Sequence, residues 1–390
     1  MRWATIIPLI GGQSIGTYQF LKEEPEVIAS FRQFKNNERY LKQYWPSFNY
    51  KILDKTNINL KLKNIDFINT LCPCAGLSEL NSGKDSELAR GVEALQNNWM
   101  YLTAEYVLQN VKPKVFYGEN TDNLFSGKIG SEISDRLYKI AVDNGYSFSM
   151  LRTDARFHGL PQKRIRTFYF FWNSKRAPSI PINSLTTNED LGMFLGEDYL
   201  INEQLNKATD RLVNNIYYKY VIKEFGQDYR SLYSGIPLTL MELIVKNNKL
   251  LDFEIFVKDI MDQKVLLKIE KHKNKLGYWD DSPIIVKDYT NSATSRNINT
   301  IHPTEERILT LGEWIKIMGM PPQFLTYLSD RRTSYLHLFQ NVPVDVARDV
   351  ARYVVQFING DLSFANTDYV KQDWVTTKFE DIGKFKHSFF

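Results

Sequence analysis

The chain has 390 residues, of which 43% are hydrophobic and 24% charged, with a formal net charge of +4. This length and apolar content can fill the cores of two domains, or of one large domain with an insertion, and they exclude a disordered chain. The charge is compatible with a polyanionic partner, but it is too small for a protein that binds nucleic acid by electrostatics alone.

The amino-terminal region contains the apolar run Ala4 to Ile10, which Gly11 and Gly12 interrupt. This run is too short to span a bilayer, and we find no signal peptide and no transmembrane segment. The chain has only two cysteines, which fits a reducing compartment in which thiols remain free. We therefore expect a cytoplasmic protein.

Apolar runs alternate with amphipathic stretches between residues 1 and 172, in the rhythm of a parallel sheet flanked by helices. Strands are predicted within residues 3–10, 48–53, 65–71, 114–118, 147–152 and 166–172. Apolar residues at helical spacing predict helices over 87–111 and 131–145, and Gly145 is a suitable carboxy-terminal cap for the second. The expected fold is α/β, with a doubly wound, mostly parallel sheet and a second, smaller domain.

The sequence pattern changes after Trp172, where a Pro-, Ser- and Asn-rich connection leads into a region without a βα rhythm. A second compact pattern begins near Asn299 and includes helices predicted over 311–320 and 343–358. These changes predict a core over 1–174, a second domain over 175–298, a segment over 299–358 that returns to the core, and a tail over 359–390 without an assigned structure.

Three kinds of reactive side chain follow the predicted strands. Cys74 comes after an apolar run and before a small, turn-prone stretch, which predicts a thiol beyond the carboxyl end of a parallel strand. Glu119 ends a later apolar run in the same way, so its carboxyl group can meet the thiol across neighbouring strand ends. Arg164 and Arg166 occupy alternate positions at the entry to a further strand and therefore point to one face. These residues predict a site with a nucleophile, an acid and a cation.

Other interpretations of the two cysteines are weaker. A zinc clip built on Cys72 and Cys74 would need two more ligands, and the five histidines are scattered without ligand spacing. A disulfide across Cys-Pro-Cys would be geometrically strained. We therefore predict no metal site and interpret Cys72 as a packing residue at the end of the strand.

Three short stretches occur in a characteristic order: CPCAGLS (72–78), GENTDN (118–123) and PQKRIR (161–166). They resemble motifs of the DNA (cytosine-5)-methyltransferase family, in which Pro-Cys supplies the nucleophile, Glu-Asn-Val the acid and Gln-x-Arg-x-Arg the arginine that holds the base. Residues 301–324 are similar to the family's Arg-x-Leu-Thr-x-x-Glu segment, and residues 341–354 are similar to its closing Asn-Ser-Val-Pro helix.

The resemblance implies a class I methyltransferase fold, Rossmann-like, with a smaller target-recognition domain. It also implies transfer of a methyl group from S-adenosylmethionine to C5 of a flipped-out cytosine in a specific duplex DNA sequence. Cys74 would add to C6, protonated Glu119 would hydrogen-bond N3, and Arg166 would hold the base carbonyl, with Arg164 in the same catalytic set. A protein of this kind is expected to act as a monomer on DNA, in a bacterial or phage-infected cell.

For the cofactor, the resemblance implies a pocket formed by Leu9, Gly11, Gly12, Asp54, Pro73, Met100, Asn341 and Val342. Asp54 matches the family's adenine-binding aspartate, whereas Met100 fits equally well as helix core. The opening loop differs from the family pattern Asp-x-Phe-x-Gly-x-Gly-Gly, because Thr5, Ile7 and Leu9 stand at its Asp, Phe and first Gly positions. A side chain on Leu9 would occupy space that the family leaves to the cofactor.

The segment 175–298 corresponds to the target-recognition region of the family, which reads bases from the major groove. It contains 17 basic and 17 acidic residues, so any contact with phosphates must be local. The DNA-binding candidates along the chain are Ser78, Gln162, Lys264, Lys271, Lys273 and Arg296. A solvated charged face explains the lysine-rich stretch 264–275 equally well.

Several interpretations of function remain open at this point. The protein can be an active methyltransferase with an unusual cofactor pocket, or an enzyme that uses a modified cofactor for another C5 chemistry. It can also be a catalytically silent relative that binds DNA for regulation or for a partner subunit. A related enzyme that acts on tRNA is a further alternative, although the length of segment 175–298 favours DNA.

Overall fold

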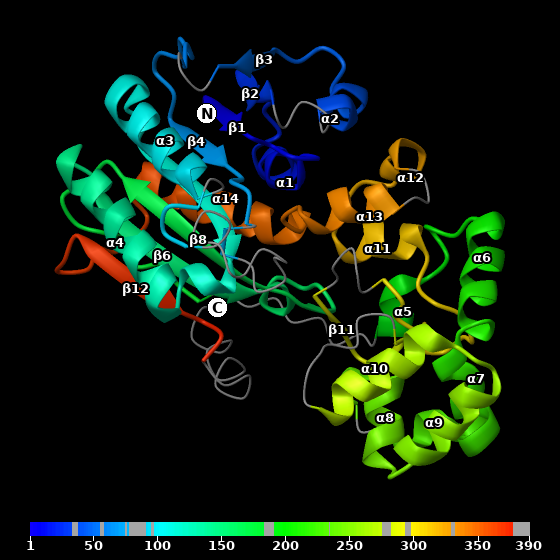
Figure 1. Cartoon of the computed structure of the whole chain (residues 1–390). Helices are drawn as coiled ribbons and strands as arrows, with labels where there is room; N and C mark the ends of the chain where they lie inside the picture. Colours follow the sequence, from blue (N-terminus) through cyan, green and yellow to red (C-terminus); the bar gives the residue numbers. More distant parts are fainter. Residues whose placement is uncertain are drawn as a thin grey trace.

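A computed structural model provides the structure of the protein (Figure 1). It describes residues 1–32, 38–54, 58–74, 76–77, 91–94, 97–182, 191–233, 235–274, 282–292, 298–328 and 332–376. Over these ranges, none of the helices has the length and apolar character that crossing a membrane requires.

An eight-stranded sheet forms the core of the larger part of the molecule (Figure 1). Its strands follow the spatial order β12-β6-β8-β5-β4-β1-β2-β3. Its strands are β1 (Trp3–Ile6), β2 (Val27–Phe31), β3 (Tyr50–Leu53), β4 (Phe67–Thr70), β5 (Val115–Thr121), β6 (Ser147–Asp154), β8 (Ile165–Trp172) and β12 (Tyr369–Asp373). Strand β8 is antiparallel to both of its neighbours, and the other neighbouring pairs are parallel. The mostly parallel α/β fold predicted from the sequence is confirmed.

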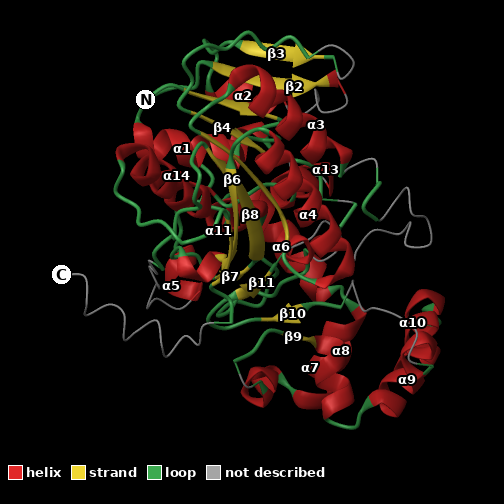
Figure 2. Ribbon diagram, turned by 90° about the vertical axis from the view of Figure 1, so that its left-hand side faces the viewer, coloured by secondary structure: helices red, strands yellow, loops and turns green. Residues whose placement is uncertain are grey.

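Helices cover both faces of this sheet (Figure 2). Two of them pack together on one face, α1 (Gly12–Leu21) and α14 (Val344–Asn359). Two others cover the opposite face, α3 (Asn98–Tyr106) and α4 (Gly127–Asp143). The connection through α1 and the connection through α3 run in opposite directions along the sheet, so the strand order reverses between β1 and β4. Doubly wound sheets bind ligands at such a point, beyond the carboxyl ends of the strands.

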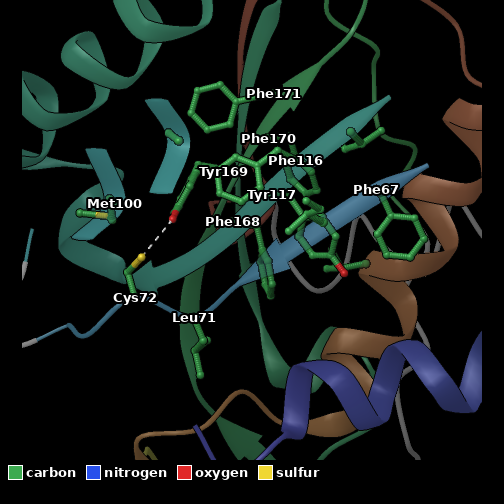
Figure 3. Packing of buried hydrophobic residues seen from close by; sticks show 14 of the residues in the cluster. Phe67, Leu71, Cys72, Met100, Phe116, Tyr117, Phe168, Tyr169, Phe170 and Phe171 are labelled. Carbon is green, nitrogen blue, oxygen red and sulfur yellow. Dashed lines mark hydrogen bonds between the residues drawn. The ribbon is translucent and has the colours of Figure 1, made fainter. Parts of the chain in front are cut away.

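The centre of the sheet is an aromatic core (Figure 3). Phe116 stacks on Phe171, and Tyr117 stacks on Phe170, across the antiparallel pair of β5 and β8. The Tyr169 hydroxyl donates a hydrogen bond to Cys72 Sγ, 3.8 Å away. Buried aromatic rings on both faces of β8 hold this strand, and the residues that precede it, in a fixed register.

The helix predictions for the core hold in one case and only partly in the other. The helix predicted over 131–145 is α4, and Gly145 follows it with a φ of +77°, the left-handed conformation of a carboxy-terminal cap. Of the stretch 87–111, residues from Asn98 onward are helical, ending in a π-helical turn over Val107–Val111. Residues 91–94, however, form a turn rather than helix. Residues 78–90 and 95–96 lie outside the described residues.

A second, mostly helical unit lies beside the sheet (Figure 1). It contains α6 (Asn202–Val213), α7 (Ile216–Phe225), α8 (Leu240–Lys246), α9 (Leu250–Asp259), α10 (Gln263–Lys273) and an antiparallel strand pair, β9 (Leu238–Thr239) and β10 (Ile284–Ile285). Its buried side chains, among them Tyr217, Met241 and Phe253, form a core separate from that of the sheet. This unit therefore packs around its own hydrophobic core and not around that of the sheet.

A group of short helices with a shared hydrophobic core connects the helical unit to the sheet. It is formed by α2 (Glu38–Tyr44), α5 (Leu191–Leu195), α11 (Leu311–Ile317), α12 (Phe324–Tyr327) and α13 (Arg332–Phe339). A short parallel ladder between β7 (Gln162–Lys163) and β11 (Thr290–Asn291) adds a second connection. Short 3-10 turns occupy Asp122–Leu124, Ala155–Phe157 and Gln227–Leu232.

The tail contributes a strand that the sequence analysis did not assign. Strand β12 pairs in parallel with β6 and extends the sheet by one position. Directly after it, Trp374 is buried, with its ring stacked on His158 and edge-on to Tyr353 of α14. The tail up to residue 376 is thus part of the central sheet and of its core.

Candidate active site

Cys74 lies in the loop after β4, and its side chain is partly exposed. The loop turns at once, because the Leu77 N–H donates to the Cys74 carbonyl oxygen over 3.0 Å. The Leu77 carbonyl oxygen in turn accepts a hydrogen bond from Asn123 Nδ2 over 2.9 Å. A Cβ at Gly76 would lie 2.7 Å from Oδ1 of Asn97, so any larger residue here would have to displace the Asn97 side chain. These contacts hold the loop that carries the thiol.

Glu119 and Arg166 meet on the strands beside this loop. Glu119 lies on β5 opposite Phe168 of β8, and Arg166 is two residues from Phe168, on the same face of the sheet. Arg166 Nε lies 2.9 Å from Glu119 Oε1. This contact is an ion pair that is not aligned as a hydrogen bond, and Oε1 has no hydrogen-bond partner among the described residues. The carboxyl group can therefore still bind a ligand.

The environment changes the proton affinity of both reactive groups. Burial raises the pKa of the Glu119 carboxyl, although Arg166 and Arg164 act in the opposite direction. Burial also raises the pKa of the Cys74 thiol, while the charges of Arg166 and Arg164 lower it and that of Glu119 raises it. All three charged side chains thus lie close enough to act on the sulfur. The site combines a thiol that is protonated at neutral pH with a carboxyl group that favours its acid form.

Arg164 occupies a different environment from Arg166. It is buried, and its guanidinium donates to Ser292 Oγ over 3.2 Å and to the carbonyl oxygens of Phe339 and Asn341 over 2.5 Å and 2.9 Å. Burial lowers its pKa, and the charge of Arg166 lowers it further. Arg166 is therefore the cation beside the acid, whereas Arg164 is engaged with protein acceptors.

The loop after β1 has an unusual backbone. Ile7 and Leu9 have φ angles of +55° and +51°, in the left-handed region that residues with a side chain rarely adopt. Both side chains are buried. Leu9 stands at the first glycine position of the family loop, so the backbone has the conformation that glycine favours although the residue is leucine. Such local strain is concentrated at functional sites.

The next two glycines are required for protein packing. A Cβ on Gly12 would lie 2.1 Å from Asn341 Nδ2 and equally close to the Val342 carbonyl oxygen, and one on Gly11 would lie 2.2 Å from Leu41. The Gly12 N–H donates to Asn341 Oδ1 over 3.0 Å. The structure therefore brings Asn341 and Val342 to the start of α1, next to the two glycines with which they are grouped as cofactor candidates in the sequence analysis.

The remaining cofactor candidates lie in different surroundings. Asp54 directly follows β3 and is exposed, and Pro73 is partly exposed beside Cys74. Met100 is fully buried in α3, where its sulfur accepts a hydrogen bond from Asn120 Nδ2 over 3.5 Å. Met100 is thus part of the helix core.

The DNA-binding candidates are spread over two regions. Gln162 is buried on β7, and neither of its side-chain polar atoms has a hydrogen-bond partner among the described residues. On α10, Lys264 and Lys271 are exposed, whereas Lys273 forms an ion pair with Glu254. Two candidates lie outside the described residues, Ser78 and Arg296. Where the chain is described, no three His, Cys, Asp or Glu side chains gather as metal ligands.

The sequence analysis did not identify three residues that position the site, Asn97, Asn123 and Ser292. Asn97 immediately precedes α3, and an asparagine at a helix start is a recognisable signal in sequence. The contacts of Asn123 and Ser292 depend on the tertiary fold and have no local signal.

The model of the C-5 cytosine-specific DNA methylase family matches residues 4–356. The chain belongs to this family. Among its relatives, the type II methyltransferase M1.BsuMI of Bacillus subtilis is 26% identical over 298 residues. This match covers 74% of the chain and 60% of the relative, so the chain spans less than two thirds of that relative's length.

Two solved structures resemble this methylase family member along most of its length. One is a methyltransferase of Entamoeba histolytica, with a TM-score of 0.56, 13% identity, and coverage of 92% of this chain and 98% of the other. The second is described as a DNA modification methyltransferase encoded within an E. coli prophage, with a TM-score of 0.59, 15% identity, and coverage of 92% and 99%. At these identities the likeness shows the fold, which is that of class I methyltransferases.

Membership of the methylase family implies S-adenosylmethionine as the methyl donor. Gln13, at the start of α1, is buried, and neither of its side-chain polar atoms forms a well-aligned hydrogen bond among the described residues, although the Tyr117 hydroxyl lies close enough to interact with it. Asp54 adds an exposed carboxylate at the same edge of the sheet. The buried Gln13 amide at the start of α1 and the Asp54 carboxylate after β3 fit S-adenosylmethionine, which carries polar groups at both of its ends.

Proposed function

We propose that this chain methylates C5 of a flipped-out cytosine in a specific sequence of double-stranded DNA, and that it acts as a monomer. The observation that carries the proposal is the meeting of Cys74, Glu119 and Arg166 at one edge of the sheet. A partly exposed thiol, a buried carboxyl group and a cation paired with it over 2.9 Å are the groups that this reaction needs.

In the first step the Cys74 thiolate adds to C6 of the base. C5 of cytosine is too weak a carbon nucleophile to accept a methyl group, and formation of the S–C6 bond converts the ring to an enamine that is nucleophilic at C5. Because the pKa of the thiol is raised in the free protein, the thiolate must form when the base arrives. Arg166, whose charge lowers that pKa, is the residue that favours this change.

Glu119 stabilises the addition in its protonated form. Its O–H donates a hydrogen bond to N3, which offsets the negative charge that develops on the ring. Burial raises the pKa of this carboxyl, so the acid form persists to a higher pH than for an ordinary glutamate. Arg166 holds both this carboxyl and the carbonyl oxygen of the base.

When bound, S-adenosylmethionine supplies the methyl group that C5 accepts. We assign its binding to the backbone of Leu9, Gly11 and Gly12, with Gln13 and Asp54 as polar partners. After C5 has accepted the methyl group, a base removes the C5 proton, the S–C6 bond breaks, and the thiolate leaves with restoration of the aromatic ring.

Access to the base requires that it leave the duplex, because stacking hides both faces of C5 and C6. Extrusion costs roughly a few kcal/mol, which contacts between protein and DNA must offset. The exposed lysines of α10, Lys264 and Lys271, are suited to phosphates, and segment 290–297 offers hydroxyl and amide groups for base edges. In the part of the chain that the structure describes, Glu119 Oε1 and both side-chain polar atoms of Gln162 have no hydrogen-bond partner, so they are available to a bound nucleotide.

Covalent trapping on DNA that contains 5-fluorocytosine tests this function. A long duplex is synthesised with 5-fluorocytosine in place of cytosine, so the recognition sequence need not be known in advance. Fluorine at C5 prevents the final elimination, and a stable adduct forms only after Cys74 has attacked and C5 has received a methyl group. We expect an adduct in the presence of S-adenosylmethionine, and none without it.

Two cysteine variants provide the matched comparison. Cys74→Ser is expected to abolish the adduct while it retains DNA binding. Cys72→Ala changes a buried cysteine two residues away, and it is expected to form the adduct. If the unmodified protein binds the duplex and the donor but never forms an adduct, the proposed reaction is wrong and the chain is a DNA-binding relative.

A further inference from the structure

One short segment of the recognition region is fixed against the catalytic strand. The β7–β11 ladder aligns Thr290 with Gln162 and Asn291 with Lys163, and the Thr290 N–H donates to the Pro161 carbonyl oxygen over 2.9 Å. This pairing places Ser292 beside Arg164. Residues 289–292 thus lie directly before the segment 293–297, which contains the candidate DNA contact Arg296.

A cation–π contact reinforces this docking. The Arg156 guanidinium lies 4.8 Å from the centre of the Tyr289 ring. Arg156 also pairs with the buried carboxylate of Asp154, whose Oδ1 accepts the backbone N–H of Arg164 over 3.3 Å. Tyr289, before the ladder, is therefore linked to Arg164 through Arg156 and Asp154. Ser292, after the ladder, accepts a hydrogen bond from Arg164 directly.

Arg164 joins three parts of the chain with one side chain. Its Nη1 donates to the Ser292 hydroxyl, and its Nη2 donates to the carbonyl oxygens of Phe339 and Asn341, which precede α14. A planar guanidinium can hold several acceptors in fixed directions, which a lysine cannot do. Because the side chain is buried, bulk water cannot replace an acceptor that is removed.

The connection continues to the start of α1. The same residue whose carbonyl oxygen accepts from Arg164, Asn341, also accepts the Gly12 N–H through its side chain over 3.0 Å. Hydrogen bonds thus lead from Ser292 through Arg164 and Asn341 to the loop assigned to the methyl donor. The charge of Arg164 also acts on Cys74 and Glu119, together with that of Arg166.

We propose that Arg164 is a positioning residue that fixes recognition segment 289–292, strand β8 and the start of α1 relative to one another, with Ser292 as the contact through which recognition acts on Cys74. This inference rests on the proposed function, because it assigns a role within that reaction. Ser292 is then required for the rate of the reaction and not for the strength of DNA binding.

The first test measures alkylation of Cys74 by iodoacetamide as a function of pH, followed by mass spectrometry, without DNA or donor. Three charged side chains act on this thiol, Arg166, Glu119 and Arg164, and the cation of Arg164 lowers its pKa. We expect Arg164→Gln to shift the alkylation midpoint to higher pH, and Ser292→Ala to shift it in the same direction by less. Ser292→Thr keeps the hydroxyl and is expected to restore the profile.

The second test compares the rate of adduct formation on 5-fluorocytosine DNA with the Kd for the same duplex. Ser292→Ala is expected to lower the rate about tenfold, equal to about 1.4 kcal/mol, with a Kd within about twofold of the unmodified protein. Ser231→Ala is the control, because the one acceptor of this exposed hydroxyl among the described residues is the Asp228 carbonyl oxygen of its own turn. It is expected to change neither quantity.

The outcomes separate this inference from the proposed function. If the unmodified protein forms no adduct, the proposed function fails, and a shifted alkylation profile still supports the positioning role. An alkylation profile of Ser292→Ala that coincides with that of the unmodified protein overturns the positioning role. If Ser292→Ala weakens DNA binding without slowing adduct formation, the positioning role is also wrong, since Ser292 would then be an ordinary DNA contact.

Discussion

Arg166 Nε lies 2.9 Å from Glu119 Oε1, and yet the pKa of the Glu119 carboxyl is raised above its ordinary value. An exposed ion pair would lower this pKa, but burial disfavours the carboxylate more strongly than the neighbouring cations favour it. The acid form is therefore available where a base with an acceptor at N3 would bind. The pair supplies a hydrogen-bond donor and a cation from two adjacent strands.

Adduct formation should pass through a maximum as pH rises. The Cys74 thiolate increases with pH, whereas the protonated form of Glu119 is present below its raised pKa and is lost as pH rises through that value. Glu119→Gln removes this titration, so we expect a rate lower by on the order of 100-fold and no decline on the alkaline side. Single-turnover trapping over a pH series measures both effects.

The control for this prediction is Glu93→Gln, which changes an exposed glutamate paired with Arg136 and should leave the pH profile unchanged. The free energy of unfolding gives a second readout. Because the folded-state pKa of Glu119 is raised, its stabilising contribution is present at low pH and is lost as pH rises through that pKa. The free energy of unfolding of Glu119→Gln should not show this decrease as pH rises. A rate that keeps rising with pH in the unmodified protein would contradict the role of the acid.

The exposed lysines of α10 should contribute to the salt dependence of DNA binding. Replacing Lys264 or Lys271 by Ala should weaken binding to all sequences alike and lower the slope of log Kd against log salt by about 1 for each phosphate that the protein no longer neutralises. Lys258→Ala is the control, because this lysine pairs with Glu254 over 3.0 Å. Identical slopes for all three variants would show that α10 is a solvated face that does not touch DNA.

Gly12→Ala should destabilise the protein. The added methyl group would lie 2.1 Å from the Val342 carbonyl oxygen, and backbone atoms cannot yield as a flexible side chain can. We expect a loss of about 1–3 kcal/mol in the free energy of unfolding, measured in urea. Gly145→Ala has open space around its Cβ and should cost only about 1 kcal/mol for its positive φ. Equal losses would indicate that α1 shifts away from the segment before α14.

Trp374→Ala should show that the tail belongs to the folded core. The Trp374 ring lies 6.1 Å from the His158 ring and 5.9 Å from the Tyr353 ring, between centroids. Its removal should lower the free energy of unfolding by about 3–5 kcal/mol, whereas Trp374→Phe should retain most of the packing. A loss below about 1 kcal/mol for Trp374→Ala would show that the tail contributes little.

Strand β2 (Val27–Phe31), whose five residues are all buried, is missing from the strands predicted from the sequence, whereas most other strands of the sheet are predicted from uninterrupted apolar runs. Strand β8 is such a run, and its aromatic residues are buried on both faces. Strand β12 contains Lys371, Gln372 and Asp373 and is only partly buried, so pairing with β6 defines it and no local pattern does. Residues 91–94 fall inside a helical pattern but form a turn, because the chain there lies against Gly76. Tertiary contacts override local preference at this point.

For the active site, sequence order indicates which residues act but not how they are supported. Cys74, Glu119 and Arg166 each follow or enter a strand, and strand ends at one edge of a parallel sheet lie close together. The separate environments of Arg164 and Arg166 could not be predicted, since both occupy equivalent alternate positions. The partners of Arg164, Ser292 and Asn341, are more than 120 residues away in the chain.

The position of β8 between β5 and β6 has a consequence for insertions and deletions. Since side chains alternate between the two faces, loss of a single residue at the start of this strand would turn Arg166 to the other face and put Thr167 in its place beside Glu119. Strand β8 is hydrogen-bonded to β5 and to β6 at once, so a slip would break two ladders rather than one. Frame-preserving length changes just before β8 should therefore be tolerated far less than equal changes in the loops of the helical unit.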